Sequence, residues 1–185
     1  MILPIAVYGH PVLRKRAKEI SADYKNLDKL IGDMFDTMYK SDGVGLAAPQ
    51  VNKSIRLIVI DATPFEEDDP SLKDFKKVII NPEILEFTDE KKAFNEGCLS
   101  LPNIREDVVR PSTVKIKYFD EKFNEFTEVW DGIKARVVQH EYDHLEGKLF
   151  IDRISPIRKR LINGKLNAIA KGKIIPNYKI IFNKK

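Results

Sequence analysis

The pattern H-E-x-x-H at residues 140–144 is the feature of this sequence that most constrains the fold. Residues four apart lie on the same face of an α-helix, so a helix here would direct His140 and His144 toward one metal ion. Glu141 would then reach a water molecule at the open coordination position of that ion, as in metal-dependent hydrolases. The alternative is a chance match on an ordinary amphipathic helix. A metal site also needs a third ligand from elsewhere in the chain.

The predicted helix starts after Asp131 and Gly132 and ends at Gly147. Asp131 is a candidate N-cap and Gly147 a candidate C-cap. Apolar residues are spread around the helix rather than confined to one stripe, so we expect most of it to be buried. Those apolar residues are Ile133, Val137, Val138 and Leu145.

A second helix is predicted over residues 26–40, where apolar residues recur at spacings of three and four. Short apolar or alternating runs predict strands, and Asn81-Pro82 is expected to end one of them. The predicted fold class is therefore α+β, with antiparallel β-sheets packed around a central buried helix that carries HExxH and with an N-terminal amphipathic helix. The predicted strands cover residues 55–61, 77–82, 83–88, 114–119 and 126–130, the last two as a hairpin. After Pro156, a final basic helix is expected over residues 157–170 and a strand over residues 173–181.

The length of 185 residues fits a single domain over residues 1–185. A hydrophobic fraction of 43% and a charged fraction of 32% are typical of soluble globular proteins. No apolar run approaches the roughly 20 residues that span a bilayer, and the first residues lack the features of a signal peptide. We therefore expect a cytoplasmic protein with no membrane partner.

Charge is unevenly distributed along the chain. Residues 153–185 contain ten Lys or Arg and no Asp or Glu, whereas the rest of the chain has 28 acidic and 22 basic residues. Such a segment is either an interaction tail for a polyanion or a solvated basic face. The loop at residues 63–75 is acidic and is expected to be exposed and mobile. Nothing in the chain indicates recognition of a specific nucleic-acid sequence.

The best candidate for the third ligand is Cys98, the only cysteine. Its thiolate would complete a Cys-His-His set that suits Zn(II) or Fe(II). Asp143 and Glu146 are weaker candidates, because they lie off the face of the helix that carries the two histidines. His10 precedes a proline, and we expect it to be structural or exposed.

Three stretches together resemble the peptide deformylase family. Residues 43–50 (GVGLAAPQ), 96–100 (EGCLS) and 139–144 (QHEYDH) resemble the three motifs of that family and occur in its order. The similarity extends over about residues 3–165. It implies removal of the formyl group from the N-terminal formylmethionine of newly synthesised polypeptides.

The resemblance also implies the metal site and its chemistry. Cys98, His140 and His144 would bind one divalent ion, Fe(II) in the cell and often Zn(II) or Ni(II) in purified protein. Metal-bound hydroxide would attack the formyl carbon, with Glu141 as general base and acid.

Further residue roles follow from the same resemblance. The side-chain amide of Gln50 and the backbone N–H of Leu99 would form the oxyanion hole. Arg105 would support Glu96 near the pocket. The remaining substrate-binding positions implied by the resemblance are Val44 and Gly45, which would hydrogen-bond the peptide backbone, and Ile133 and Val137, which would line the methionine pocket.

The chain departs from the family pattern in two places. The acidic insertion at residues 61–76 is longer than in compact members and could reshape the rim of the groove. Residues 153–185 contain Gly164, Gly172 and Pro176, so an extended end is expected where compact members have a long helix. Contact of this basic segment with the ribosome is a hypothesis. The alternative function is an HExxH zinc metallopeptidase, and a further alternative is a module with a structural zinc.

Overall fold

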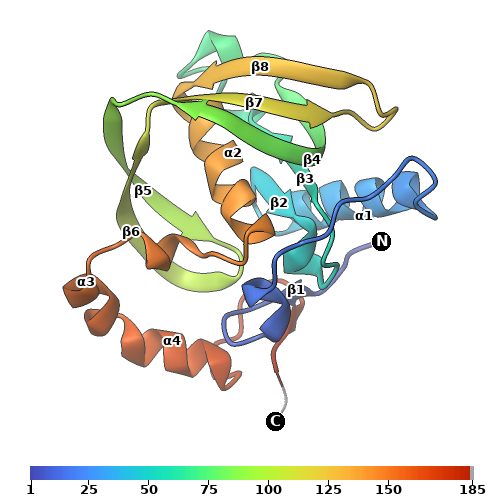
Figure 1. Cartoon of the computed structure of the whole chain (residues 1–185). Helices are drawn as coiled ribbons and strands as arrows, with labels where there is room; N and C mark the ends of the chain where they lie inside the picture. Colours follow the sequence, from blue (N-terminus) through green and yellow to red (C-terminus); the bar gives the residue numbers. More distant parts are fainter. Residues whose placement is uncertain (184–185) are drawn as a thin grey trace.

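The HExxH motif lies in α2 (Gly132–Leu145), a helix at the centre of the computed structural model, which describes residues 1–183 (Figure 1). A five-stranded antiparallel sheet of order β2-β3-β4-β7-β8 covers one side of α2. The β5-β6 hairpin lies on another side of the helix, and α1 (Leu27–Lys40) lies beyond the sheet. The predicted α+β class is confirmed.

The strands and the remaining helices have the following bounds. In chain order they are β1 (Ile5–Ala6), β2 (Gly45–Ala47), β3 (Leu57–Asp61), β4 (Lys76–Phe87), β5 (Lys91–Cys98), β6 (Leu101–Pro111), β7 (Thr113–Phe119), β8 (Glu125–Asp131), α3 (Pro156–Leu161), α4 (Asn163–Ala170) and β9 (Ile180–Ile181). No helix among residues 1–183 is long and apolar enough to cross a membrane.

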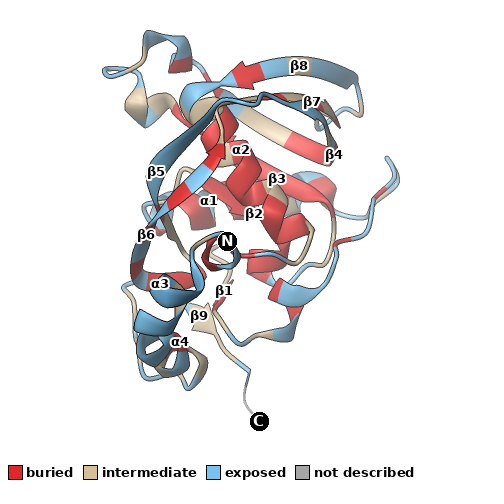
Figure 2. Cartoon of the chain, turned by 60° about the vertical axis from the view of Figure 1, so that its left-hand side comes forward, coloured by how far each residue is buried: buried red, intermediate tan, exposed pale blue. Residues whose placement is uncertain are grey.

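The strand β3 shows how the sheet is held between the two long helices. Its five residues are all buried. Ile58 and Ile60 pack in the cluster that contains α2, while Leu57 and Val59 pack in the cluster that contains α1. Successive side chains of a strand point to opposite faces, so a strand covered on both faces is apolar at every position. Figure 2 shows the buried residues concentrated in α2, β2 and β3.

In β4, the strand end predicted at Asn81-Pro82 is wrong. Instead of ending there, the strand continues to Phe87, and the residues predicted as a third strand form its second half. The register with β7 shifts between Ile80 and Glu83, and Asn81 has a φ of +48°. The Asn-Pro pair therefore marks a bulge within one strand, because asparagine tolerates the left-handed region and proline cannot donate to the ladder.

The end of the chain differs from the expectation. One basic helix was expected over residues 157–170, but the segment forms α3 and α4, separated at Ile162. The strand expected over residues 173–181 is limited to Ile180–Ile181, which pairs in parallel with β1. Lys184 and Lys185 of the predicted basic segment lie outside the described residues. The acidic loop at residues 63–75 contains two 3-10 turns and buries Leu72 and Phe75.

The bulge yields a stability prediction. The side chain of Asn81 donates to the carbonyl of Ile20 at 2.7 Å and accepts from its amide at 3.0 Å. Asn81→Ala should lower the free energy of unfolding by about 2–4 kcal/mol, because both hydrogen bonds are lost and alanine is strained at this φ. Urea denaturation measures the change.

The matched control is Asn52→Ala. Asn52 also has a positive φ, of +60°, but it is exposed and its side chain makes no hydrogen bond to the described residues. Its substitution should cost only the backbone strain of about 1–2 kcal/mol. Equal losses in the two variants would contradict the role given to the Asn81 side chain.

Candidate metal centre

Three side chains with metal-ligand atoms converge at the heart of the fold. Cys98 ends β5, while His140 and His144 lie one turn apart on α2. Their ligand atoms all lie within 4.8 Å of one another, and the Cys98 Sγ is 3.3 Å from His144 Nε2. The helix and the hairpin therefore bring together the three residues that the sequence predicted as ligands.

The surroundings of the two histidines fit a metal ion. His140 Nδ1 is 2.9 Å from Glu96 Oε2, so Glu96 accepts the Nδ1 proton and the Nε2 lone pair is left for a metal. His144 is buried, and burial lowers its pKa well below the usual value. His144 is therefore neutral, as a ligand must be. One thiolate and two imidazoles are a donor set for Zn(II) or Fe(II), and three protein ligands are typical of catalytic zinc sites.

Glu141 lies beside this cluster. Its carboxylate is buried, and the Oε2 atom has no hydrogen-bond partner among the described residues. Burial raises the pKa of Glu141 to about 7. A carboxylate with this pKa can both take up and release a proton near neutral pH.

Gly45 leaves the space that Glu141 occupies. A Cβ at this position would lie 2.7 Å from Glu141 Oε1 and 2.9 Å from Val137 Cγ1. A larger residue would therefore displace the carboxylate, which explains why this motif has glycine here.

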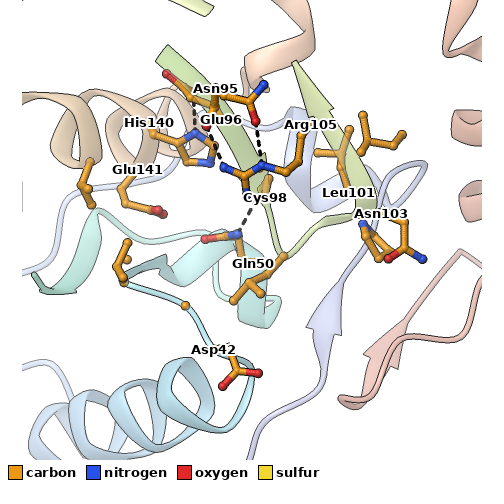
Figure 3. A pocket seen from close by; sticks show the side chains of 18 of the residues that line it. Asp42, Gln50, Asn95, Glu96, Cys98, Leu101, Asn103, Arg105, His140 and Glu141 are labelled. Atoms are coloured by element: carbon orange, nitrogen blue, oxygen red, sulfur yellow. Dashed lines mark hydrogen bonds and ion pairs between the residues drawn. The ribbon is translucent and has the colours of Figure 1, made fainter. Parts of the chain in front are cut away.

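Gln50 directs its amide group toward the cluster. Its Oε1 accepts from the amide of Ala47 at 2.8 Å, which fixes the orientation of the side chain. Its Nε2 then lies 3.6 Å from Cys98 Sγ (Figure 3). The same Nε2 lies 3.3 Å from Ser100 Oγ. The backbone of Leu99 follows directly after the cysteine. Both oxyanion-hole donors that the resemblance implied thus lie next to the metal-ligand cluster.

A buried charge network joins the hairpin to α2. The guanidinium of Arg110 on β6 donates to both oxygens of Glu96, at 2.7 and 2.9 Å, and to Asp143 at 2.7 Å. Arg136 on α2 donates to Glu96 at 2.9 Å. Burial would raise the pKa of Glu96, but hydrogen bonds from Arg110 and His140 hold it well below its usual value. Glu96 is therefore an anion that orients His140.

The predicted contact between Arg105 and Glu96 is wrong. Arg105 donates instead to the side chain of Asn95 at 2.8 Å and to its carbonyl at 2.7 Å (Figure 3). Arg105 pairs with Gly97 in the hairpin, and its side chain lies over that glycine. Glu96 is bound by Arg110 and Arg136, two residues that the sequence analysis missed. The sequence did offer a signal for Arg136. It is a basic residue, between Ile133 and Val137, on a helix that is predicted to be buried.

A cavity of about 830 Å³ opens onto the cluster. All the predicted substrate-binding residues line it, Arg105 included. Residues that were not predicted also line it, among them Phe65 of the acidic insertion and residues 175–178 near the C-terminus. The predicted members of the lining are Val44, Gly45, Gln50, Glu96, Cys98, Leu99, Arg105, Ile133, Val137, His140 and Glu141.

Comparisons with known proteins agree with this geometry. The family model of polypeptide deformylase matches residues 2–160. The peptide deformylase of Christiangramia forsetii is 52% identical over 189 residues, which covers 98% of this chain and 96% of the relative.

Solved structures give the same result for the fold. The peptide deformylase of Legionella pneumophila has a TM-score of 0.81 at 40% identity and covers 94% of this chain and 98% of its own. The enzyme of Thermotoga maritima has a TM-score of 0.76 at 46% identity and covers 84% of this chain and 99% of its own. This chain belongs to the peptide deformylase family of enzymes.

Proposed function

We propose that this enzyme removes the formyl group from the N-terminal formylmethionine of nascent polypeptides, with one divalent metal ion held by Cys98, His140 and His144. The observation that supports the proposal best is the convergence of these three ligand atoms within 4.8 Å, beside the buried carboxylate of Glu141. Fe(II) is the ion we propose for the cell, with Zn(II) or Ni(II) in purified protein. When bound, the ion supplies a Lewis acid that polarises the formyl carbonyl and lowers the pKa of a water molecule.

Glu141 acts as the general base and general acid of the reaction. Its free Oε2 faces no competing donor among the described residues, so it is available to take a proton from the attacking water. Its pKa of about 7 then allows it to pass the proton to the departing amine. Without this transfer the amine would have to leave as an unstable anion.

Gln50 and Leu99 stabilise the negative charge that develops on the formyl oxygen. The Gln50 amide is held in place by Ala47, so its N–H groups need no reorientation during the reaction. Removing one such donor typically costs about 3 kcal/mol of transition-state stabilisation.

The peptide would lie along β2, in the cavity between this strand and the hairpin. β2 is the edge strand of the five-stranded sheet, so its outer edge carries backbone groups that an extended peptide can pair with. Val44 and Gly45 are at this edge. Ile133 and Val137, half-buried on the first turns of α2, would contact the methionine side chain.

The alternative of an HExxH zinc metallopeptidase is not favoured. The third ligand comes from the upstream Cys98 rather than from a residue after His144, and the matching relatives are deformylases. A structural zinc is also not favoured, because such sites have four protein ligands and the cluster in the described chain has three.

We also propose that residues 1–185 act as a single domain whose basic segment faces the ribosome. Ile162, Leu166 and Ile169 of this segment pack against β6, which ties it to the rest of the chain. Three of its eight cations among the described residues are paired within the fold, and the other five form no ion pair with the described residues, so they are available to a polyanion such as RNA. The pairs are Arg153 with Asp143, Arg158 with Glu106 and Lys159 with Asp152.

A formate assay tests the proposed function. Anaerobically purified enzyme should release formate from a formyl-Met peptide and leave the unformylated peptide intact. Glu141→Gln should keep the bound metal and lower kcat by about 10²–10⁴-fold, because the proton carrier is removed while the ligands remain. Bound metal is measured by mass spectrometry of the same sample.

Two outcomes would contradict the proposal. One is a folded, metal-loaded wild-type protein that releases no formate. The other is cleavage of the unformylated peptide. Cys98→Ala is the control for metal loss, because it should reduce bound metal and activity together.

The charge network yields a second prediction. Arg110→Met should lower the free energy of unfolding by about 3–5 kcal/mol, because it removes three buried, charge-assisted hydrogen bonds and leaves Glu96 and Asp143 with fewer cationic partners. It should also weaken metal affinity about 10–100-fold, since Glu96 orients His140. Denaturation of the metal-free protein and a metal titration separate the two effects.

Arg105→Met is the matched control on the same hairpin. Arg105 is exposed and bonds only Asn95, so this variant should stay near wild type in stability. If Arg110→Met were no less stable than Arg105→Met, the network would not have the role described above.

A further inference from the structure

The segment after α4 turns back toward the substrate cavity. Gly172 ends α4 with a φ of +66°, and the ring of Phe182 covers it so closely that a Cβ there would lie 2.8 Å from Phe182 Cζ. Farther along, Ile5 pairs with Ile180 in the parallel ladder of β1 and β9. The segment between Gly172 and Ile180 is therefore held at both ends.

Side chains of this segment alternate in exposure. Ile174, Pro176 and Tyr178 are half-buried, while Ile175 and Asn177 between them are exposed. Ile175 is 87% exposed, although it is a large apolar residue. Residues 175–178 all line the cavity that contains the metal-ligand cluster. An exposed apolar side chain at the wall of a substrate cavity is available for contact with a ligand.

Tyr178 connects the segment to the reaction centre. Its hydroxyl donates to the carbonyl of Leu99 at 2.7 Å. The next carbonyl, that of Ser100, accepts from the amide of Tyr8 at 2.9 Å. These two bonds fix the backbone that follows Cys98, which includes the Leu99 N–H assigned above to the oxyanion hole.

The direction of the substrate places its later residues near this segment. The formyl group is at the N-terminal end of the peptide and would lie next to Glu141. The methionine pocket is at the first turns of α2, next to β8. Figures 1 and 2 show the C-terminal segment beside β1, away from β8 and the start of α2. The rest of the peptide can therefore extend toward this part of the cavity, which residues 175–178 line.

We propose that residues 175–178 form the wall of the substrate groove for the peptide residues after formylmethionine, with Ile175 in contact with the peptide and Tyr178 as a positioning residue for the Leu99 backbone. This proposal rests on the deformylase activity proposed above. It gives the C-terminal segment a part in substrate selection, with a preference for apolar side chains after the methionine.

The first test compares a short and a longer substrate. Rates are measured for formyl-Met-Ala and for formyl-Met-Ala-Leu-Ala with wild-type enzyme and with Ile175→Asp. The ratio of kcat/KM for the longer substrate to kcat/KM for the shorter one should fall about tenfold in the variant, because the charge removes an apolar contact with the added residues. Ile157→Asp, at an isoleucine on α3 that is 74% exposed and does not line the cavity, is the matched control and should keep the wild-type ratio.

The second test removes only the Tyr178 hydroxyl. Tyr178→Phe should lower kcat about 3–10-fold on both substrates, with KM for the short one and bound metal as in wild type, because the oxyanion hole acts in the transition state. A wild-type kcat in this variant would overturn the positioning role. Equal ratios for Ile175→Asp and Ile157→Asp would overturn the groove wall. If wild-type enzyme released no formate, the proposed function itself would fail.

Discussion

The buried charge network of Arg110, Glu96 and Asp143 is the interaction on which the proposed metal centre depends. Arg110 and Glu96 lie on the hairpin, and Asp143 lies on α2. Cys98 belongs to the β5-β6 hairpin, whereas the two histidines belong to α2, so the ligand set exists only if these elements are held together. Arg110 brings Glu96 and Asp143 to one guanidinium, and Glu96 in turn holds His140. Charges this deeply buried are stable only as a fully paired group.

The same burial gives Glu141 its chemistry. A carboxylate in water has a pKa near 4, too low to carry a proton at neutral pH. In this site the surrounding α2, β2 and hairpin raise that pKa to about 7. Burying a carboxylate oxygen without a hydrogen-bond partner lowers the stability of the fold, and Gly45 provides the space for this side chain. Residues next to Glu141 are therefore constrained by the space that this carboxylate needs as well as by packing.

The parts of this structure that depend on local sequence were predictable. The period of α1 and the H-E-x-x-H spacing of α2 indicate helices from local sequence alone. The hairpin partner of Glu96 was not predictable, because Arg105 and Arg110 both lie on β6 and the strand register decides which of them reaches Glu96. Register depends on pairing between distant residues. The path of residues 172–183 likewise depends on pairing with β1, about 175 residues earlier in the chain.

X-ray absorption spectroscopy at the metal edge tests the central claim most directly. For enzyme purified anaerobically, the proposed site predicts one sulfur and two imidazole nitrogens around the ion, at about 2.3 Å and about 2.0–2.1 Å for zinc. The sulfur shell should disappear in Cys98→Asp, if this variant still binds metal. A wild-type spectrum with no sulfur shell, or with two sulfurs, would contradict the Cys98, His140 and His144 centre.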